Sequence, residues 1–324
     1  MRIGVKIGIG IDIGSSLIGT QIGHFIFFTS LSLFIVFILI FLYNNSISQE
    51  ILSMTPEYEN LINSLISDGY LKTPLLIEAF KNIDRQDFVP EEYKNSAYIN
   101  EPLPIGFEQT ISQPLTVAFL MELLEPKPGE KILDIGAGSG WSAALLAYVV
   151  GKENLQSEIR NPKIIGIERL SELKEFAEKN LAKYGFIDPI KNKTPQAPLE
   201  TSANFYSDLT LRPDGKQKKS LTGQASGDAP SAGRISNGVE KGIAMIVCAD
   251  GVKGYRKEAP YDKILAGAAA KGDVPAEWKK QLKIGGRIVA PVGNSIVVID
   301  KTGKGKYSRK EHFGFSFVPL ISDK

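Results

Sequence analysis

The stretch that decides the fold is Ile132-Leu-Asp-Ile-Gly-Ala-Gly-Ser-Gly-Trp141. Its first four residues are typical of a buried strand, and the apolar run 142–150 that follows the glycines predicts a helix. Glycine lets the backbone turn sharply and approach a ligand closely. Ligands of open α/β sheets bind at the carboxyl ends of such strands. The stretch therefore predicts a ligand-binding strand end, with an ordinary strand-to-helix turn as the alternative.

The spacing of the glycines narrows the class of ligand. Dinucleotide-binding folds show G-x-G-x-x-G, whereas Gly136, Gly138 and Gly140 follow G-x-G-x-G and Asp134 precedes them. This variant resembles the first motif of S-adenosylmethionine-dependent methyltransferases. The resemblance implies that cofactor, with the acid and the three glycines in its binding site. The early third glycine disfavours a nicotinamide-dependent oxidoreductase.

Strand and helix patterns alternate on both sides of this stretch. Predicted strands are 131–135, 163–167, 243–249, 263–266, 287–291 and 296–299; predicted helices are 56–66, 74–83, 115–124, 140–150, 171–184 and 275–282. Alternation of this kind favours an α/β fold with a doubly wound, mostly parallel sheet.

Two further strand ends carry acids. Glu168 follows the strand after the glycine turn, where an acid can accept hydrogen bonds from both hydroxyls of a ribose. Asp250-Gly251 ends the next strand, where the acid can face an adenine amino group or can belong to a plain Asp-Gly turn. The sequence leaves both interpretations of Asp250 open.

The segment Gln109-Thr-Ile-Ser-Gln-Pro114 precedes a predicted helix. Ser112 stands two residues ahead of the proline, so its hydroxyl could cap that helix. The same hydroxyl could instead contact a substrate bound beside the glycine turn. The local sequence does not decide whether Ser112 caps the helix or contacts a substrate.

A wider resemblance depends on this segment. The block Leu103-Pro-Ile-Gly-Phe-Glu-Gln-Thr-Ile-Ser-Gln-Pro-Leu-Thr-Val-Ala118 resembles the hallmark of protein-L-isoaspartate (D-aspartate) O-methyltransferases. The stretches 80–90, 132–141, 167–169, 249–251, 259–265, 285–293 and 317–320 are similar to further family segments. Together the resemblance covers about 56–187 and 243–322.

The resemblance implies methyl transfer from S-adenosylmethionine to the α-carboxylate of L-isoaspartyl residues in damaged proteins. It assigns Ser112 to catalysis, with Thr110 and Gln113 as further candidates from the same loop. Asp134 and the glycines at 136, 138 and 140 would bind the cofactor together with Glu168, Asp250 and Gly251. The substrate peptide is expected to lie extended near 318–320. A carboxylate is ionised at neutral pH, so its attack on a methyl group needs no strong base.

Two alternatives stay open. The chain could methylate another acceptor, or it could be an inactive, membrane-tethered cofactor-binding protein of the same fold. Glu108 stands where the family commonly has glycine, which puts efficiency in doubt.

Composition excludes several other classes. Lysine and arginine total 38 and acids 36, so charge gives no argument for a nucleic-acid partner. Cys248 is the only cysteine, which rules out an intrachain disulfide and a cysteine metal cluster, and it is expected at a buried strand position. The two histidines, His24 and His312, leave little material for a metal site or a Ser-His-Asp triad. We expect no metal, and we expect His312 on a surface strand.

Two regions depart from a plain catalytic domain. Residues 1–53 form an N-terminal extension whose uncharged stretch 25–43 is long enough for a transmembrane helix. A signal peptide, or a true translation start at Met54, are the alternatives. The methyltransferase domain, 54–324, is expected to be cytoplasmic and membrane-anchored, or fully soluble if translation starts at Met54. A polar, flexible insertion interrupts it at about 188–242.

Overall fold

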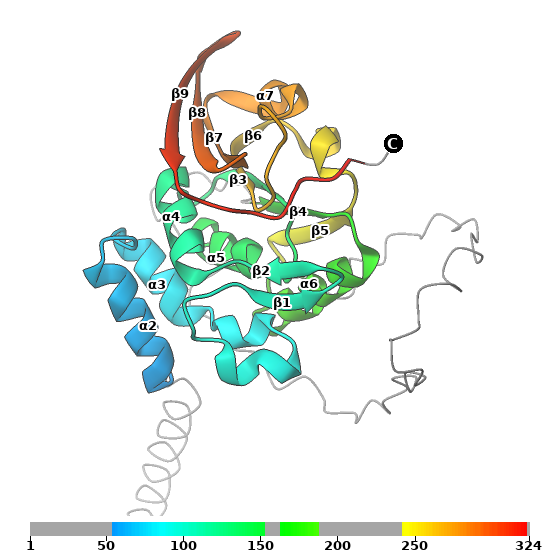
Figure 1. Cartoon of the computed structure of the whole chain (residues 1–324). Coiled ribbons are helices and arrows are strands. Elements are labelled where there is room, and N and C mark those ends of the chain that lie inside the picture. The colour runs from blue at the N-terminus through cyan, green and yellow to red at the C-terminus, as the bar shows by residue number, and fades with distance from the viewer. Residues whose placement is uncertain (1–53, 153–162, 188–241, 323–324) are drawn as a thin grey trace, which may run out of the picture. The chain divides into compact units, whose positions relative to one another are not determined.

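The computed structural model describes residues 54–152, 163–187 and 242–322 (Figure 1). The chain divides into two compact units, Met1–Ser53 and Met54–Lys324, and every described residue belongs to the second. The predicted span 25–43 and the predicted insertion, apart from Gly242, lie outside the described residues. Among the helices that are described, none is long and apolar enough to cross a membrane.

The centre of the described fold is a seven-stranded sheet with the order β5-β4-β3-β6-β7-β8-β9. The strands are β3 (Lys131–Ile135), β4 (Lys163–Glu168), β5 (Ala244–Cys248), β6 (Tyr261–Ala266), β7 (Leu282–Val292), β8 (Ser295–Gly303) and β9 (Lys306–Phe313). The strands from β5 to β7 pair in parallel, while β8 and β9 pair antiparallel. The predicted α/β fold with a mostly parallel sheet is confirmed. The sheet is mixed, because its last two strands are antiparallel.

Helices supply the layers around the sheet. They are α2 (Pro56–Ser67), α3 (Pro74–Asn82), α4 (Pro114–Leu124), α5 (Trp141–Val150), α6 (Ser171–Lys183) and α7 (Ala276–Gln281). Proline opens α2, α3 and α4 at the position where its missing N–H costs nothing. These helices begin within a residue of the predicted starts, because the proline signals are local.

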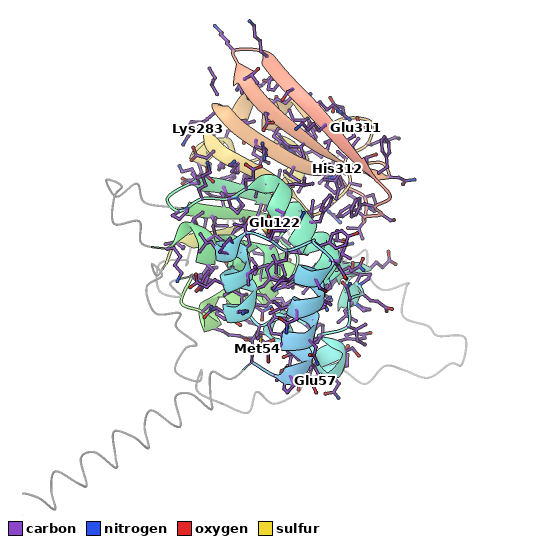
Figure 2. The ribbon with its side chains drawn as sticks, turned by 90° about the vertical axis from the view of Figure 1, so that its left-hand side faces the viewer. Met54, Glu57, Glu122, Lys283, Glu311 and His312 are labelled. Carbon is purple, nitrogen blue, oxygen red and sulfur yellow. The ribbon has the colours of Figure 1, made fainter. Side chains whose placement is uncertain are left out.

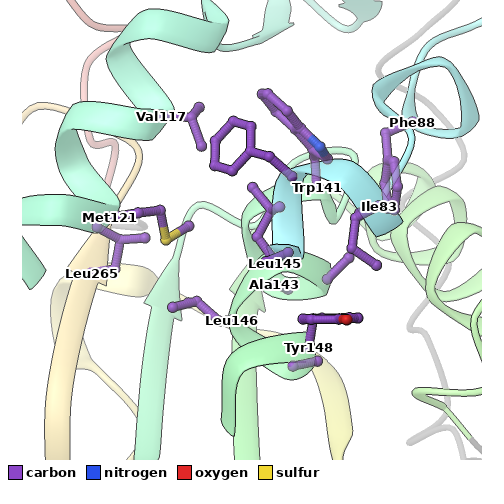
Figure 3. Close-up of a cluster of buried hydrophobic side chains, with 14 of the residues drawn as sticks. Ile83, Phe88, Val117, Met121, Trp141, Ala143, Leu145, Leu146, Tyr148 and Leu265 are labelled. Atoms are coloured by element: carbon purple, nitrogen blue, oxygen red, sulfur yellow. The ribbon is translucent and has the colours of Figure 1, made fainter. Parts of the chain in front are cut away.

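Two hydrophobic clusters bury the two faces of the sheet. The larger joins α4 and α5 to the strand residue Leu265, with Trp141 and Met121 buried among its members (Figure 3). The smaller packs Trp278 of α7 against Ile264 and Ile288 on the other face. Because both faces are covered, the central strands are apolar on both sides, as parallel strands usually are.

A small hairpin stands apart from the main sheet. β1 (Leu103–Gly106) and β2 (Gln109–Ile111) pair antiparallel, with Gly106 opposite Gln109. Phe107 and Glu108 form the turn, and both have positive φ, at 52° and 58°. The sequence did not predict these strands, because Pro102 and Pro104 lie close together and proline is unusual inside a strand.

The far edge of the sheet also differs from expectation. β9 was not predicted, because nearly all of its side chains are exposed and its sequence lacks apolar alternation. His312 does lie on this surface strand, edge-on against Phe119, as expected (Figure 2). Cys248 lies on a strand but is exposed, so its predicted burial is wrong. β5 is the edge strand of the sheet, where fewer neighbours cover a side chain.

Candidate active site

A pocket opens where the strand order reverses. From β3 the chain proceeds outward through β4 and β5, and then returns to place β6 on the other side of β3. The carboxyl ends of these four strands line an open cleft of about 1040 Å³, part of which is open to solvent. Such a reversal is the usual binding position in open α/β sheets.

The glycine turn forms the floor of the pocket. Gly136, Gly138 and Gly140 all have positive φ, at 78°, 55° and 87°, which explains why glycine occupies each position. A side chain on Gly140 would also lie 3.1 Å from the Cβ atom of Ala177 on α6. Gly136 and Gly138 line the pocket, whereas Gly140 sets the close approach of α5 to α6.

Asp134 lies at the tip of β3 and lines the pocket. Its side chain is buried, Oδ2 accepts a 2.6 Å hydrogen bond from the Ser142 hydroxyl, and Oδ1 has no partner in the described chain. Burial raises its pKa to about 6; the Ser142 bond lowers the value and the charge of Glu168 raises it. A buried carboxylate oxygen without a donor indicates a place for a cationic or hydrogen-bonding ligand group.

Glu168 ends β4 beside the glycine turn. Its two carboxylate oxygens accept from the backbone N–H groups of Gly138, at 3.0 Å, and Leu170, at 2.9 Å. These bonds fix the carboxylate at the pocket wall. Each oxygen keeps a lone pair that could accept from a ligand hydroxyl.

Asp250 and Gly251 follow β5 and behave differently from each other. The Asp250 carboxylate accepts from the Val252 N–H and the Ser322 hydroxyl, both at 2.9 Å, and does not line the pocket. Burial would raise its pKa, but these bonds and Lys253 lower it overall. Gly251 does line the pocket, and a Cβ there would lie 2.7 Å from a methyl group of Ile135.

The predicted catalytic loop forms one wall of the same pocket. Thr110 and Ser112 both line it, beside Asp134. Helix α4 takes Gln113 as its N-cap residue and has no side-chain cap bond, so Ser112 does not cap the helix. Gln113 lies outside the pocket lining, and its amide donates to the carbonyl of Asn100 at 2.9 Å.

Several pocket residues were missed by sequence reasoning. Ile105 of the hairpin, together with Val117 and Met121 of α4, supplies apolar wall. Residues 318–321 also line the pocket, in the region where the substrate peptide was expected, and bonds between Ala269 and the backbone of Val318 and Leu320, both at 2.8 Å, hold them there. The segment makes one isolated parallel bridge, between Pro319 and Ala269. Apolar residues carry no local signal of a site, so only the fold brings them together.

Within residues 54–152, 163–187 and 242–322, no group of three or more His, Cys, Asp or Glu side chains is placed to hold a metal ion.

Solved structures with this fold include protein methyltransferases. A Plasmodium falciparum protein described as a protein-L-isoaspartate O-methyltransferase, in complex with S-adenosyl-L-homocysteine, superposes with a TM-score of 0.55 at 20% identity, covering 82% of this chain and 99% of the other. A second protein-L-isoaspartate O-methyltransferase superposes with a TM-score of 0.57 at 21% identity, covering 82% of this chain and 66% of the other. At these identities the likeness concerns the fold alone.

Sequence relatives carry the comparison further. A protein-L-isoaspartate O-methyltransferase of Methanopyrus kandleri is 34% identical over 82% of this chain and 92% of its own length. A protein-L-isoaspartate O-methyltransferase of Ignicoccus hospitalis is also 34% identical, over 84% of this chain and 100% of its own length. The family model Protein-L-isoaspartate(D-aspartate) O-methyltransferase (PCMT) matches residues 56–192 and 231–324. The chain therefore belongs to the protein-L-isoaspartate (D-aspartate) O-methyltransferase family.

Proposed function

We propose that this protein transfers a methyl group from S-adenosylmethionine to the α-carboxylate of L-isoaspartyl residues in damaged proteins. The observation that carries the proposal is the meeting of two segments in one pocket. The loop with Thr110 and Ser112 lies beside Asp134, the glycine turn and Glu168. Family membership supports the choice of cofactor and acceptor.

The pocket residues fit S-adenosylmethionine. The cofactor carries a positive sulfonium and an ammonium group, and the unpartnered Oδ1 atom of Asp134 offers a buried negative acceptor. Gly136 and Gly138 leave room for a ligand chain, and Glu168 can accept from ribose hydroxyls. When bound, the cofactor supplies an electrophilic methyl group. Because the Asp250 carboxylate is engaged by Val252 and Ser322, we assign it the role of shaping the strand end that Gly251 presents.

The protein's own part in the reaction is placement. The substrate carboxylate is already ionised at neutral pH, so it needs orientation and no general base. The Ser112 hydroxyl has no hydrogen-bond partner within the described chain and can donate to that carboxylate. Holding two reactants in line can supply several kcal/mol of a barrier. The resulting ester can close to a succinimide, whose hydrolysis partly restores normal aspartate.

The acceptor peptide has a place between two walls. The β1–β2 hairpin borders the pocket on one side and residues 318–321 border it on the other. The backbone of 318–320 already bonds to Ala269 on one edge. We infer that an extended peptide lies in this gap, with its isoaspartyl carboxylate at Ser112.

The full chain should be incubated with labelled S-adenosylmethionine and two peptides that differ only in isoaspartyl or aspartyl linkage. We expect label in the isoaspartyl peptide alone. Equal labelling of both peptides, or labelling of small-molecule acceptors instead, would point to another acceptor. Cofactor binding with no transfer would indicate an inactive member of the family.

We also propose that residues 25–43 anchor the chain in a membrane with the catalytic unit on the cytoplasmic side, where its cofactor is made. The support is the length of this uncharged stretch. The full chain should remain in the membrane pellet after an alkaline wash. Leu33→Arg with Val36→Arg should release it, because each central arginine costs about 3 kcal/mol of insertion. A wild-type chain found in the supernatant, or beginning at Met54 by mass spectrometry, would contradict the anchor.

A further inference from the structure

A buried arginine lies directly behind the Ser112 loop. Arg85 opens the 3-10 helix η1 (Arg85–Phe88), and its side chain is 0% exposed. Its two terminal nitrogens donate to four backbone carbonyls. The acceptors are Ala97 at 2.5 Å, Ile99 at 3.2 Å, Glu101 at 2.9 Å and Ser112 at 3.2 Å. One side chain therefore ties the segment 97–101 to the loop that lines the pocket.

The positive charge of Arg85 is not balanced by a carboxylate within the described residues. In the described part of the chain no carboxylate forms an ion pair with it, its Nε atom has no partner, and its guanidinium lies 5.4 Å from the ring centre of Trp141. Burial lowers its pKa to about 10, which leaves it charged at neutral pH. A buried, unpaired charge is costly in a folded protein. Its position beside an active-site loop suggests a role other than stability.

The other charged residues around the pocket indicate what Arg85 could do there. Asp134 and Glu168 are both acidic and lie at the cofactor end. They suit a cationic cofactor, but they repel an anionic acceptor. Arg169 lines the pocket next to Glu168, at the same end. Arg85 is the cation held against Ser112, where the acceptor carboxylate would bind.

Other bonds hold the same two segments together. The Leu115 N–H donates to the Asn100 side-chain oxygen at 3.0 Å, and the Gln113 amide donates to the Asn100 carbonyl. These two bonds join the segments through neutral groups. Arg85 adds the only charged donor among the contacts described between them.

We propose that Arg85 is a positioning residue for methyl transfer: it fixes the Ser112 loop through its carbonyl and provides the buried positive charge that favours binding of the acceptor carboxylate. The proposal rests on the isoaspartyl methyltransferase function proposed above. A neutral clamp of the same shape would hold the loop, but would not attract the anion.

The test compares the full wild-type chain with Arg85→Lys and Arg85→Gln. The KM for an isoaspartyl peptide should rise roughly 10-fold or more in Arg85→Gln, because a unit charge in a partly buried setting, at an effective dielectric constant of about 20, contributes interactions of this size. Arg85→Lys keeps the charge, so its KM should rise by only a few-fold. Affinity for S-adenosylhomocysteine should stay within about twofold in both variants. Equal KM values for the lysine and glutamine variants, or a parallel loss of S-adenosylhomocysteine affinity, would overturn the charge role.

A matched control separates positioning from general loss of stability. The buried Tyr261 hydroxyl donates to the Tyr255 carbonyl at 2.6 Å, in the other hydrophobic cluster and away from the pocket lining. Tyr261→Phe should lower the melting temperature without changing the peptide KM. If it raises KM as much as Arg85→Gln does, the proposed role of Arg85 fails.

Hydrogen exchange tests the clamp without any activity. Exchange over residues 109–117, which include the Leu115 amide, should accelerate in Arg85→Gln and Arg85→Lys but not in Tyr261→Phe. Unchanged exchange in the arginine variants would overturn the positioning role, even if the wild-type chain proved inactive towards isoaspartyl peptides. If Arg85→Gln does not fold, Arg85→Lys decides, since wild-type KM together with wild-type exchange in that variant would contradict the proposal.

Discussion

At the scale of single residues, Ser112 is the side chain whose role is easiest to isolate. Its hydroxyl lines the pocket, and Ser112→Ala removes no side-chain hydrogen bond within the described residues. We expect kcat/KM for an isoaspartyl peptide to fall about 10- to 100-fold, the loss of a hydrogen bond to a charged group. Affinity for S-adenosylhomocysteine, measured by calorimetry, should be unchanged. Thr110→Val tests the neighbouring hydroxyl in the same way. A 10- to 100-fold loss of S-adenosylhomocysteine affinity in Ser112→Ala would contradict a catalytic role for Ser112.

Asp134 should show opposite effects on stability and on binding. Its pKa is raised from 3.8 to about 6 by burial, so the folded state binds a proton more tightly than the unfolded state. Stability is therefore lost as pH rises from about 4 to about 6, and the cost at neutral pH is roughly 3 kcal/mol. Asp134→Asn should stabilise the cofactor-free protein near pH 7.5, and the gain should vanish near pH 4. Chemical unfolding at both pH values measures this.

The same substitution should weaken cofactor binding. A cationic ligand favours the ionised carboxylate, so affinity for S-adenosylmethionine should increase as pH rises through about 6 and then level off. In Asp134→Asn the affinity should be lower and this dependence should disappear. A wild-type affinity that stays flat between pH 5 and pH 7.5 would show that Asp134 does not contact the cation.

At the scale of elements, the β1–β2 hairpin carries strain in its turn. A two-residue turn with positive φ at both positions favours glycine or asparagine, yet Phe107 and Glu108 occupy it. Glu108→Gly should therefore stabilise the protein by about 1 kcal/mol in urea unfolding, partly offset by the greater freedom of glycine in the unfolded chain. Glu108→Ala keeps the Cβ atom and should give no such gain. If both variants behave alike, the turn is not strained by its side chain.

The elements also show which patterns can be read from sequence. β3 and the glycine turn were predicted because apolar strand residues, an acid and alternate glycines stand together in the chain. Asp134, Gly136 and Glu168 entered the predicted site for the same reason, and the pocket contains them. Arg85 lies in the family-like stretch 80–90, but nothing in that stretch indicated its role: its partners are backbone carbonyls up to 27 positions away, which only the fold brings together. β9 was missed because an exposed edge strand has no apolar periodicity.

At the scale of the whole molecule, the insertion leaves and re-enters the domain at one place. The Gly242 N–H donates to the Gly185 carbonyl and the Ala244 N–H to the Phe186 carbonyl, both at 2.9 Å. The family model skips residues 193–230. Deleting those residues should leave cofactor binding intact, and should stabilise the domain by roughly 1 kcal/mol through a shorter closed loop.

Thermal unfolding and calorimetry with S-adenosylhomocysteine measure the effect of this deletion. Replacing 193–230 with a Gly/Ser segment of equal length is the control, because it keeps the loop length and removes the sequence. A deletion that lowers the melting temperature would mean that the segment contributes packing to the domain.

The division of the pocket between chain segments has an evolutionary consequence. The strand ends from Asp134 to Ala268 form the side assigned to the cofactor, whereas the hairpin and residues 318–321 form the side assigned to the acceptor. Selection can therefore act on the two sides separately. Changes in a short hairpin and a terminal segment could redirect the enzyme to a new acceptor while the inherited cofactor chemistry is retained.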